Sequence, residues 1–252
     1  MSRKNNYTPL KLDSVAGRTY VFGDIHGTFE ELNCLLDFLR KEGNLSVNDR
    51  VIFVGDYIDR GYHSKEVVDL LLQLRKDIPE TYFLKGNHED MFLDYLGLGG
   101  MHGDNFVKNG GEQTLISYKQ HIAASSKEVL ESMPDDHIEF YKNLHSIIEL
   151  EKHFIVHAGI NPFVELLDQA PMDLFWIRDD FIMTEHELGK TVVFGHTPFK
   201  NVFADWPYKI GIDTGLVYGN LLTCLELSEG VCHQVRAGNL EVMSSDLNIP
   251  IS

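Results

Sequence analysis

Five short apolar runs in this chain end in the same way, at a glycine with an acid, an amide or an imidazole beside it. The clearest spans residues 51–61 and reads VIFVGDYIDRG. Its first four residues are continuously apolar and mostly β-branched or aromatic, which predicts a strand buried on both faces. Asp56 then follows the strand, where a carboxylate can bridge two hard cations. The repetition predicts ligands carried on loops at strand ends.

The other four runs end in GDIHG at 23–27, GNHE at 86–89, HAG at 157–159 and GHT at 195–197. Asp24 and His26 are two residues apart, so in extended backbone both side chains lie on one side and can bind one cation. A single histidine in such a place is more often a hydrogen-bonded structural residue. Together, however, the ligand-type side chains predict a site for two divalent ions. They are Asp24, His26, Asp56, Asn87, His157 and His196.

The order of elements predicts an α/β (α+β) chain, with two packed sheets or one large mixed sheet flanked by helices. Strands are expected over 18–22, 51–54, 81–84, 153–156, 191–194 and 209–212, with a hairpin over 220–227 and 231–236. Thr28 with Glu31 predicts a capping box for the first helix, and Ser64 predicts the cap of the second. A mainly helical insertion is expected at about 97–150, and a loose tail after Glu241.

The composition narrows the class of protein. At 252 residues with 43% hydrophobic residues, the chain is expected to form one domain over 1–252. The formal net charge of -16 argues against binding to nucleic acid or to an anionic membrane, so an anionic substrate needs local positive charge. The three cysteines are too scattered for a disulfide framework, and no signal peptide or membrane span is evident. A cytoplasmic location is therefore expected, and no oligomeric state is predicted.

Taken in order, GDIHG, GDYIDRG, GNHE, HAG and GHT resemble the phosphoprotein phosphatase family of calcineurin-like metallophosphoesterases. The resemblance covers residues 23–197, and it is strongest to serine/threonine protein phosphatases of the bacterial and phage type. The WIR at 176–178 and the NGG at 109–111 fit the same group. The fold implied is a central β-sandwich of mixed sheets flanked by helices.

The resemblance also implies a role for each motif residue. Asp24 and His26 would hold one metal, and Asp56 would bridge it to a second. The second metal would be held by Asn87, His157 and His196. The implied pair is manganese, or iron with manganese or zinc. A water activated by both metals would attack phosphorus directly and in line.

Four residues are implied to act on the substrate. His88 would be the general acid, and Asp59 would orient it. Arg60 and Arg178 would bind the phosphate together with Asn87, and forked arginine donors suit that task. The implied substrate is a phosphorylated protein or peptide, which makes the expected activity that of a serine/threonine protein phosphatase.

Two alternatives stay open. Symmetrical bis(5'-nucleosyl)-tetraphosphate hydrolases share this scaffold, but their second motif usually has a small residue before RG and their third reads GNHD. Asp59 and Glu89 in this chain therefore favour the protein phosphatase. The more remote alternative is a non-catalytic metal-binding scaffold, and it is disfavoured because every catalytic position of the family is kept.

Overall fold

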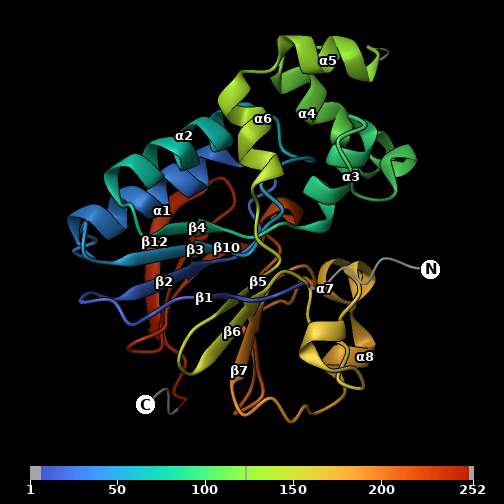
Figure 1. Ribbon diagram of the computed structural model, residues 1–252. Coiled ribbons are helices and arrows are strands. Elements are labelled where there is room, and N and C mark those ends of the chain that lie inside the picture. Colours follow the sequence, from blue (N-terminus) through green and yellow to red (C-terminus); the bar gives the residue numbers. More distant parts are fainter. Residues whose placement is uncertain (1–6, 123, 250–252) are drawn as a thin grey trace.

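Two mixed sheets pack face to face at the centre of the protein (Figure 1). The computed structural model describes residues 7–122 and 124–249, and each sheet within those ranges has six strands. Strand β2 (Thr19–Phe22) shows why the strands are apolar throughout, because Tyr20 and Phe22 face one apolar cluster while Val21 faces another. The predicted sandwich of mixed sheets flanked by helices is confirmed.

The first sheet contains the strands that precede the first three motifs. Besides β2 it consists of β3 (Arg50–Phe53), β4 (Thr81–Phe83), β10 (Leu221–Glu226), β11 (Val231–Arg236) and β12 (Asn239–Asp246). The strand order is β12-β11-β10-β2-β3-β4, in which β2, β3 and β4 are parallel. The hairpin predicted near the C-terminus is confirmed as β10 and β11.

The second sheet contains the strands that precede the last two motifs. It consists of β1 (Leu10–Lys11), β5 (Ile147–Glu149), β6 (His153–Val156), β7 (Thr191–Phe194), β8 (Phe203–Asp205) and β9 (Lys209–Gly211). The strand order is β1-β5-β6-β7-β9-β8, in which β6, β7 and β9 are parallel. Ile52, Ile155 and Val193 belong to the apolar cluster that joins the two sheets.

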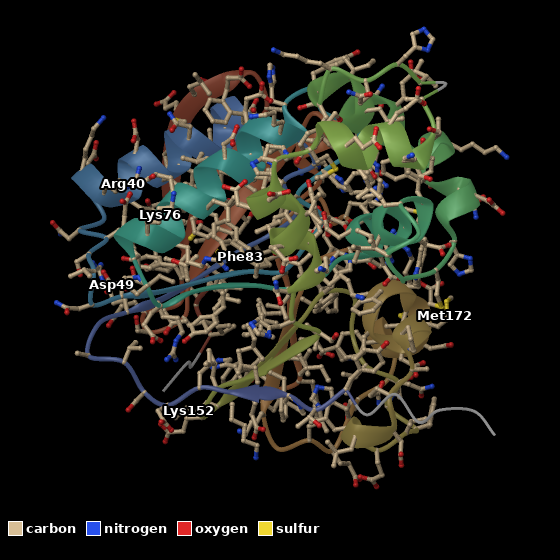
Figure 2. All side chains as sticks on the ribbon, turned by 45° about the horizontal axis from the view of Figure 1, so that its top comes forward. Arg40, Asp49, Lys76, Phe83, Lys152 and Met172 are labelled. Carbon is tan, nitrogen blue, oxygen red and sulfur yellow. The ribbon has the colours of Figure 1, made fainter. Side chains whose placement is uncertain are left out.

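Helices cover the outer faces of the sandwich. They are α1 (Phe29–Lys41), α2 (Ser64–Asp77), α3 (Asn87–Tyr95), α4 (Gly111–Ser117), α5 (Ser126–Ser132), α6 (Asp135–Lys142), α7 (Pro171–Trp176) and α8 (Asp179–Ile182). Figure 1 shows α1 and α2 over the first sheet, α7 and α8 beside the second, and α3 to α6 at one end. Phe83 lies buried under this helical layer, whereas Lys76 projects from the exposed side of α2 (Figure 2).

The segment 97–150, predicted to be mainly helical, contains α4, α5 and α6. It also has two 3₁₀ turns, Gly103–Asn105 and Val107–Asn109, and its last residues form strand β5. Its helices pack on α2 and α3, and Phe106, Leu115 and Phe140 belong to the same apolar cluster as the underside of α1 and α2. The segment is therefore built into the core.

Three local expectations are wrong. The tail predicted to be loose after Glu241 continues strand β12 as far as Asp246, paired with β11, and its residues 250–252 lie outside the described residues. Thr28 makes no capping bond, and its hydroxyl donates to the carbonyl of Ile25. Ser64 is the first residue of α2, not its cap, and its hydroxyl accepts the N–H of Asp59 instead.

Within the described residues, no helix is both long enough and apolar enough to cross a membrane.

Candidate active site

The carboxyl ends of parallel strands from both sheets meet at one edge of the sandwich. Asp24, Asp56 and Asn87 follow β2, β3 and β4, while His157 and His196 follow β6 and β7. The two groups are joined directly, since His157 Nδ1 lies 3.0 Å from the carbonyl of Val54 and the N–H of His196 donates to Asp24. All six predicted metal-binding residues are therefore neighbours, and all are buried.

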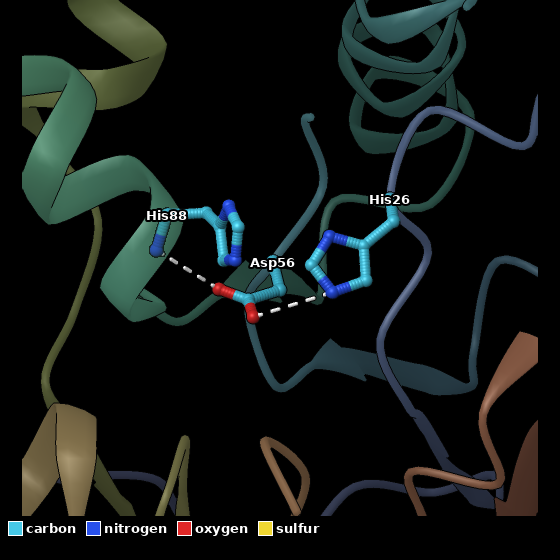
Figure 3. Close-up of side chains that lie close together, drawn as sticks. All are labelled: His26, Asp56 and His88. Carbon is cyan, nitrogen blue, oxygen red and sulfur yellow. Dashed lines mark hydrogen bonds and ion pairs between the residues drawn. The ribbon is translucent and has the colours of Figure 1, made fainter. Parts of the chain in front are cut away.

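One cluster of possible metal ligands is formed by His26, Asp56 and His88 (Figure 3), whose donor atoms lie within 4.8 Å of one another. His26 Nε2 is 3.5 Å from Asp56 Oδ2. Asp24, expected to share a metal with His26, belongs to neither such cluster among the described residues. Its carboxylate accepts the N–H of His196 at 3.0 Å. The role of Asp24 as a ligand stays a prediction.

A second cluster is formed by Asp56, His157 and His196, again within 4.8 Å of one another. His157 Nε2 lies 3.5 Å from Asp56 Oδ1. Asn87 completes the group, because its Oδ1 is 3.1 Å from His157 Nε2 and 2.9 Å from His196 Nδ1. Asp56 belongs to both clusters, which is the position that a bridging ligand requires.

The metal-ligand atoms fit cations because several hydrogen-bond acceptors face one another. Nδ1 of His26 and Nδ1 of His157 are bonded to the carbonyls of Ile58 and Val54, which places the ring proton there and leaves both Nε2 atoms as lone pairs. The lone pair of His157 points at the amide oxygen of Asn87 and at Asp56. That of His26 faces Asp56 at 3.5 Å, but the guanidinium of Arg60 lies closer, at 2.7 Å. Burial, and then the nearby carboxylates of Asp213 and Asp56, raise the pKa of Asp24. Bound cations would satisfy the acceptors that face one another here.

A further sign is the nitrogen Nε2 of His196, which is buried and has no hydrogen-bond partner among the described residues. Burial lowers the pKa of His196 and of His26, so each imidazole is held neutral and able to bind a metal. The metals that this donor set suits are borderline to hard divalent ions, because it combines carboxylate, amide oxygen and imidazole.

Unusual backbone conformations are concentrated at this site. Of the nine residues other than glycine with positive φ in the described ranges, five are His26, Asp56, Asp59, Arg60 and His196. Side chains disfavour this left-handed region, so the surrounding structure must hold it. Gly86 is required for a different reason, because a Cβ there would clash with the Asp56 carboxylate.

His88 and Asp59 form a buried pair. His88 Nδ1 lies 2.6 Å from Asp59 Oδ2, so the shared proton is on Nδ1 and Nε2 carries the one available for transfer. Burial alone would lower the pKa of His88, but the carboxylates of Asp56 and Asp59 outweigh it and raise the pKa above its usual value. The pair has the geometry that the general-acid prediction needs.

The two arginines differ in how they are held. Arg60 is half-buried, and its guanidinium lies 2.7 Å from His26 Nε2 and 5.4 Å from the centre of the Tyr218 ring. Arg178 is exposed and donates to the hydroxyl of Thr197, beside His196. Both therefore border the metal clusters, from opposite sheets. Their predicted role in binding phosphate is compatible with this placement and stays a prediction.

Two acids at the site were not assigned a role from the sequence. Glu89 accepts three backbone N–H groups, those of Asp56 and Gly86 with Oε2 and that of Tyr57 with Oε1. Asp213 is buried at the end of β9, and burial raises its pKa to about 6. Its place after a parallel strand is the same signal that identified His157 and His196. The hydrogen bonds of Glu89, in contrast, could not be predicted from the sequence, in which Glu89 is marked only by its place in GNHE.

The model of the calcineurin-like phosphoesterase family matches residues 17–220, which contain every motif and every strand that precedes one. The chain belongs to this family. It is therefore a metal-dependent phosphoesterase, and the two clusters sharing Asp56 are its candidate metal-binding groups.

Two curated relatives of this family member share one name. The bis(5'-nucleosyl)-tetraphosphatase PrpE [asymmetrical] of Oceanobacillus iheyensis is 30% identical over 231 residues, 83% of this chain and 88% of that protein. The protein of the same name from Bacillus thuringiensis is 27% identical over 232 residues, 83% of this chain and 90% of its own length.

Solved structures share the fold of this phosphoesterase. A "putative diadenosine tetraphosphatase" has a TM-score of 0.68 at 24% identity, over 91% of this chain and 98% of its own. A serine/threonine phosphatase of Saccharomyces cerevisiae has a TM-score of 0.58 at 17% identity, over 94% of this chain and 82% of its own. At such identities the likeness concerns the fold alone.

Proposed function

We propose that this protein hydrolyses dinucleoside tetraphosphates, cleaving them asymmetrically, with two divalent ions of which manganese is the first choice. The sequence pointed first to a serine/threonine protein phosphatase, and that specificity is not confirmed. The curated relatives favour the dinucleotide alternative. They differ from that alternative in one respect, because their name specifies asymmetrical cleavage.

The observation that carries the choice of a nucleotide substrate is the ring of Tyr218. It is 65% exposed, yet it lies over the guanidinium of Arg60, which in turn contacts His26 in the first metal cluster. Nucleobases stack on exposed aromatic rings and on guanidinium planes. A phosphate held by Arg60 would therefore have an aromatic surface beside it, and a phosphoserine has no group that could use this surface.

The backbone under Tyr218 is well held, which suits a stacking surface. The ring is on a 3₁₀ turn, Leu216–Tyr218, where the N–H of Tyr218 donates to Gly215 and Leu216 is buried in the core. Asp213 accepts the N–H of Gly215 at 2.9 Å, so this turn is attached directly to the edge of the site. Little ordering of the backbone would be needed when a base binds.

The chemistry follows from the residues. When bound, the two divalent ions would supply a hydroxide at neutral pH and positive charge beside the phosphate. Arg60 and Arg178 would bind non-reacting phosphate oxygens. The water oxygen would bond to the phosphorus attached to one of the two nucleosides. The bond from that phosphorus to the oxygen that bridges it to the next phosphate would break, and His88 would protonate this departing oxygen. One nucleoside monophosphate and one nucleoside triphosphate would result.

The test compares kcat/KM of the manganese-loaded protein for diadenosine tetraphosphate with that for phosphoserine and phosphothreonine peptides at matched concentrations. We expect the dinucleotide to be preferred by well over tenfold, with AMP and ATP as products. A preference for the peptides would restore the protein phosphatase. Two molecules of ADP as products would support the symmetrical alternative.

A further inference from the structure

Helix α4, in the segment 97–150, lies against the loop that carries Asp59 and Arg60. Two of its residues, and the glycine just before it, contact that loop or the start of α2. The carbonyl of Gly110, just before the helix, accepts the N–H of Arg60 at 3.0 Å. Ser117 accepts the N–H of Lys65 at 2.7 Å. Between them, Thr114 contacts Asp59.

The hydroxyl of Thr114 uses all of its hydrogen-bonding capacity. Its proton is donated to Asp59 Oδ1 at 2.6 Å, and its oxygen accepts the N–H of Asp59 at 2.9 Å. Because that single proton is already used, the contact of 3.0 Å with Ser64 Oγ has Ser64 as the donor. Thr114 is fully buried, so water cannot replace any of these bonds without rearrangement.

Thr114 thus bonds both the backbone N–H and the carboxylate of Asp59. Asp59 has a φ of 71°, a conformation that a residue other than glycine adopts only when its surroundings hold it. One bond from Thr114 holds the backbone in that conformation, and the other fixes one carboxylate oxygen. The second carboxylate oxygen is then directed at His88 Nδ1, 2.6 Å away.

We propose that Thr114 is a positioning residue for the reaction, which sets the rotation of the Asp59 carboxylate and, through it, the tautomer and orientation of the His88 imidazole. The segment 97–150 thereby contributes to catalysis through Asp59 and His88. This inference rests on phosphoester hydrolysis with His88 as the acid, but not on whether the substrate is a dinucleotide or a phosphopeptide.

The kinetic test uses two simple monoesters, phenyl phosphate and p-nitrophenyl phosphate, and three variants. Phenolate is a basic leaving group that needs a proton, whereas p-nitrophenolate is stable without one. Thr114→Val keeps the shape of the side chain but removes the hydroxyl. It should lower kcat on phenyl phosphate by about 10- to 100-fold, as loss of an orienting partner does. The fall in kcat on p-nitrophenyl phosphate should be clearly smaller. Thr114→Ser keeps the hydroxyl and should restore the rate on phenyl phosphate.

Ser117→Ala is the matched control. It removes one hydroxyl from the same helix and the same contact surface, but that hydroxyl bonds Lys65 and Glu66 instead of Asp59. The ratio of the two rates should stay at the wild-type value. Equal losses on both substrates in Thr114→Val, or the same change of ratio in Ser117→Ala, would show that the helix acts only through stability and would overturn the proposal.

A second measurement does not depend on turnover. In zinc-loaded protein, the Nδ1 proton of His88 should give a far-downfield NMR signal because of its short bond to Asp59. We expect this signal to be kept in Ser117→Ala and Thr114→Ser and to move upfield or broaden in Thr114→Val, or in Thr114→Ala if the valine variant does not fold. An unchanged signal in a folded variant without the hydroxyl would contradict the proposal.

Discussion

Replacing His88 by asparagine removes the proposed transferable proton while leaving the neighbouring Asn87, a predicted metal ligand, in place. His88 is 1% exposed and Asp59 fixes its tautomer, so bulk solvent has little access to the position of this proton. General acid catalysis contributes about 10² to 10⁴ in rate, or about 3 to 5 kcal/mol of barrier, when the leaving group is strongly basic. We expect close to this full loss on a phosphoserine peptide, whose leaving group is an alkoxide.

The loss should be smaller where the leaving group is less basic. On diadenosine tetraphosphate the departing group is a phosphate oxygen, so the cost should approach that on p-nitrophenyl phosphate. The assay is kcat on the three substrates, with metal content measured on the same samples. His63→Asn, the same change at a partly exposed histidine outside the clusters, should leave all three rates unaltered. Equal losses on all substrates with both metals retained would mean that His88 positions the phosphate and is not the acid.

Three further predictions test other parts of the account. Glu89→Gln should turn an amide N–H₂ toward a backbone N–H and weaken metal binding by about 10- to 100-fold, as measured by calorimetric titration. Glu128→Gln alters an exposed carboxylate that also accepts a backbone N–H, and it should leave metal binding unchanged. Tyr218→Ala should lower kcat/KM for the dinucleotide by about 5- to 100-fold and much less for p-nitrophenyl phosphate, while Tyr218→Phe keeps the ring and should stay near wild type. Burial lowers the pKa of His153 from 6.5 to about 4, so the unfolded chain takes up the proton first and the stability contributed by this group is lost as the pH falls between those values. Between pH 7.5 and pH 5, the free energy of unfolding of the wild type should fall by about 2 kcal/mol more than that of His153→Gln, as measured by denaturant unfolding. An equal fall in the two proteins would contradict this.

The positions of the proposed metal-binding residues could be predicted because strand ends are a local signal. Each residue follows an apolar run, and parallel strands bring their carboxyl ends to one edge of a sheet. Asp24, Asp56 and Asn87 are gathered by the first sheet in this way, and His157 and His196 by the second. Packing of the two sheets then brings the two edges together.

The contacts that support these residues could not be predicted, because they join distant parts of the chain. Thr114 and Asp59 are 55 residues apart in sequence, and Glu89 is 33 residues from Asp56. Strand β12 was missed for a different reason. It is an exposed edge strand paired only with β11, so its residues show no buried alternation. The capping roles of Thr28 and Ser64 failed because both hydroxyls find other partners.

The central claim is that two buried clusters sharing Asp56 bind two divalent ions on which hydrolysis depends. The most direct measurement is the metal content of protein that has been treated with chelator, dialysed against manganese and assayed on diadenosine tetraphosphate. We predict two ions per wild-type chain, no turnover after chelation, and recovery on reloading. Asp56→Asn removes the shared charge and should lose both ions and nearly all activity. Full activity of Asp56→Asn with two ions bound, or full activity of the chelated wild-type protein, would contradict the claim.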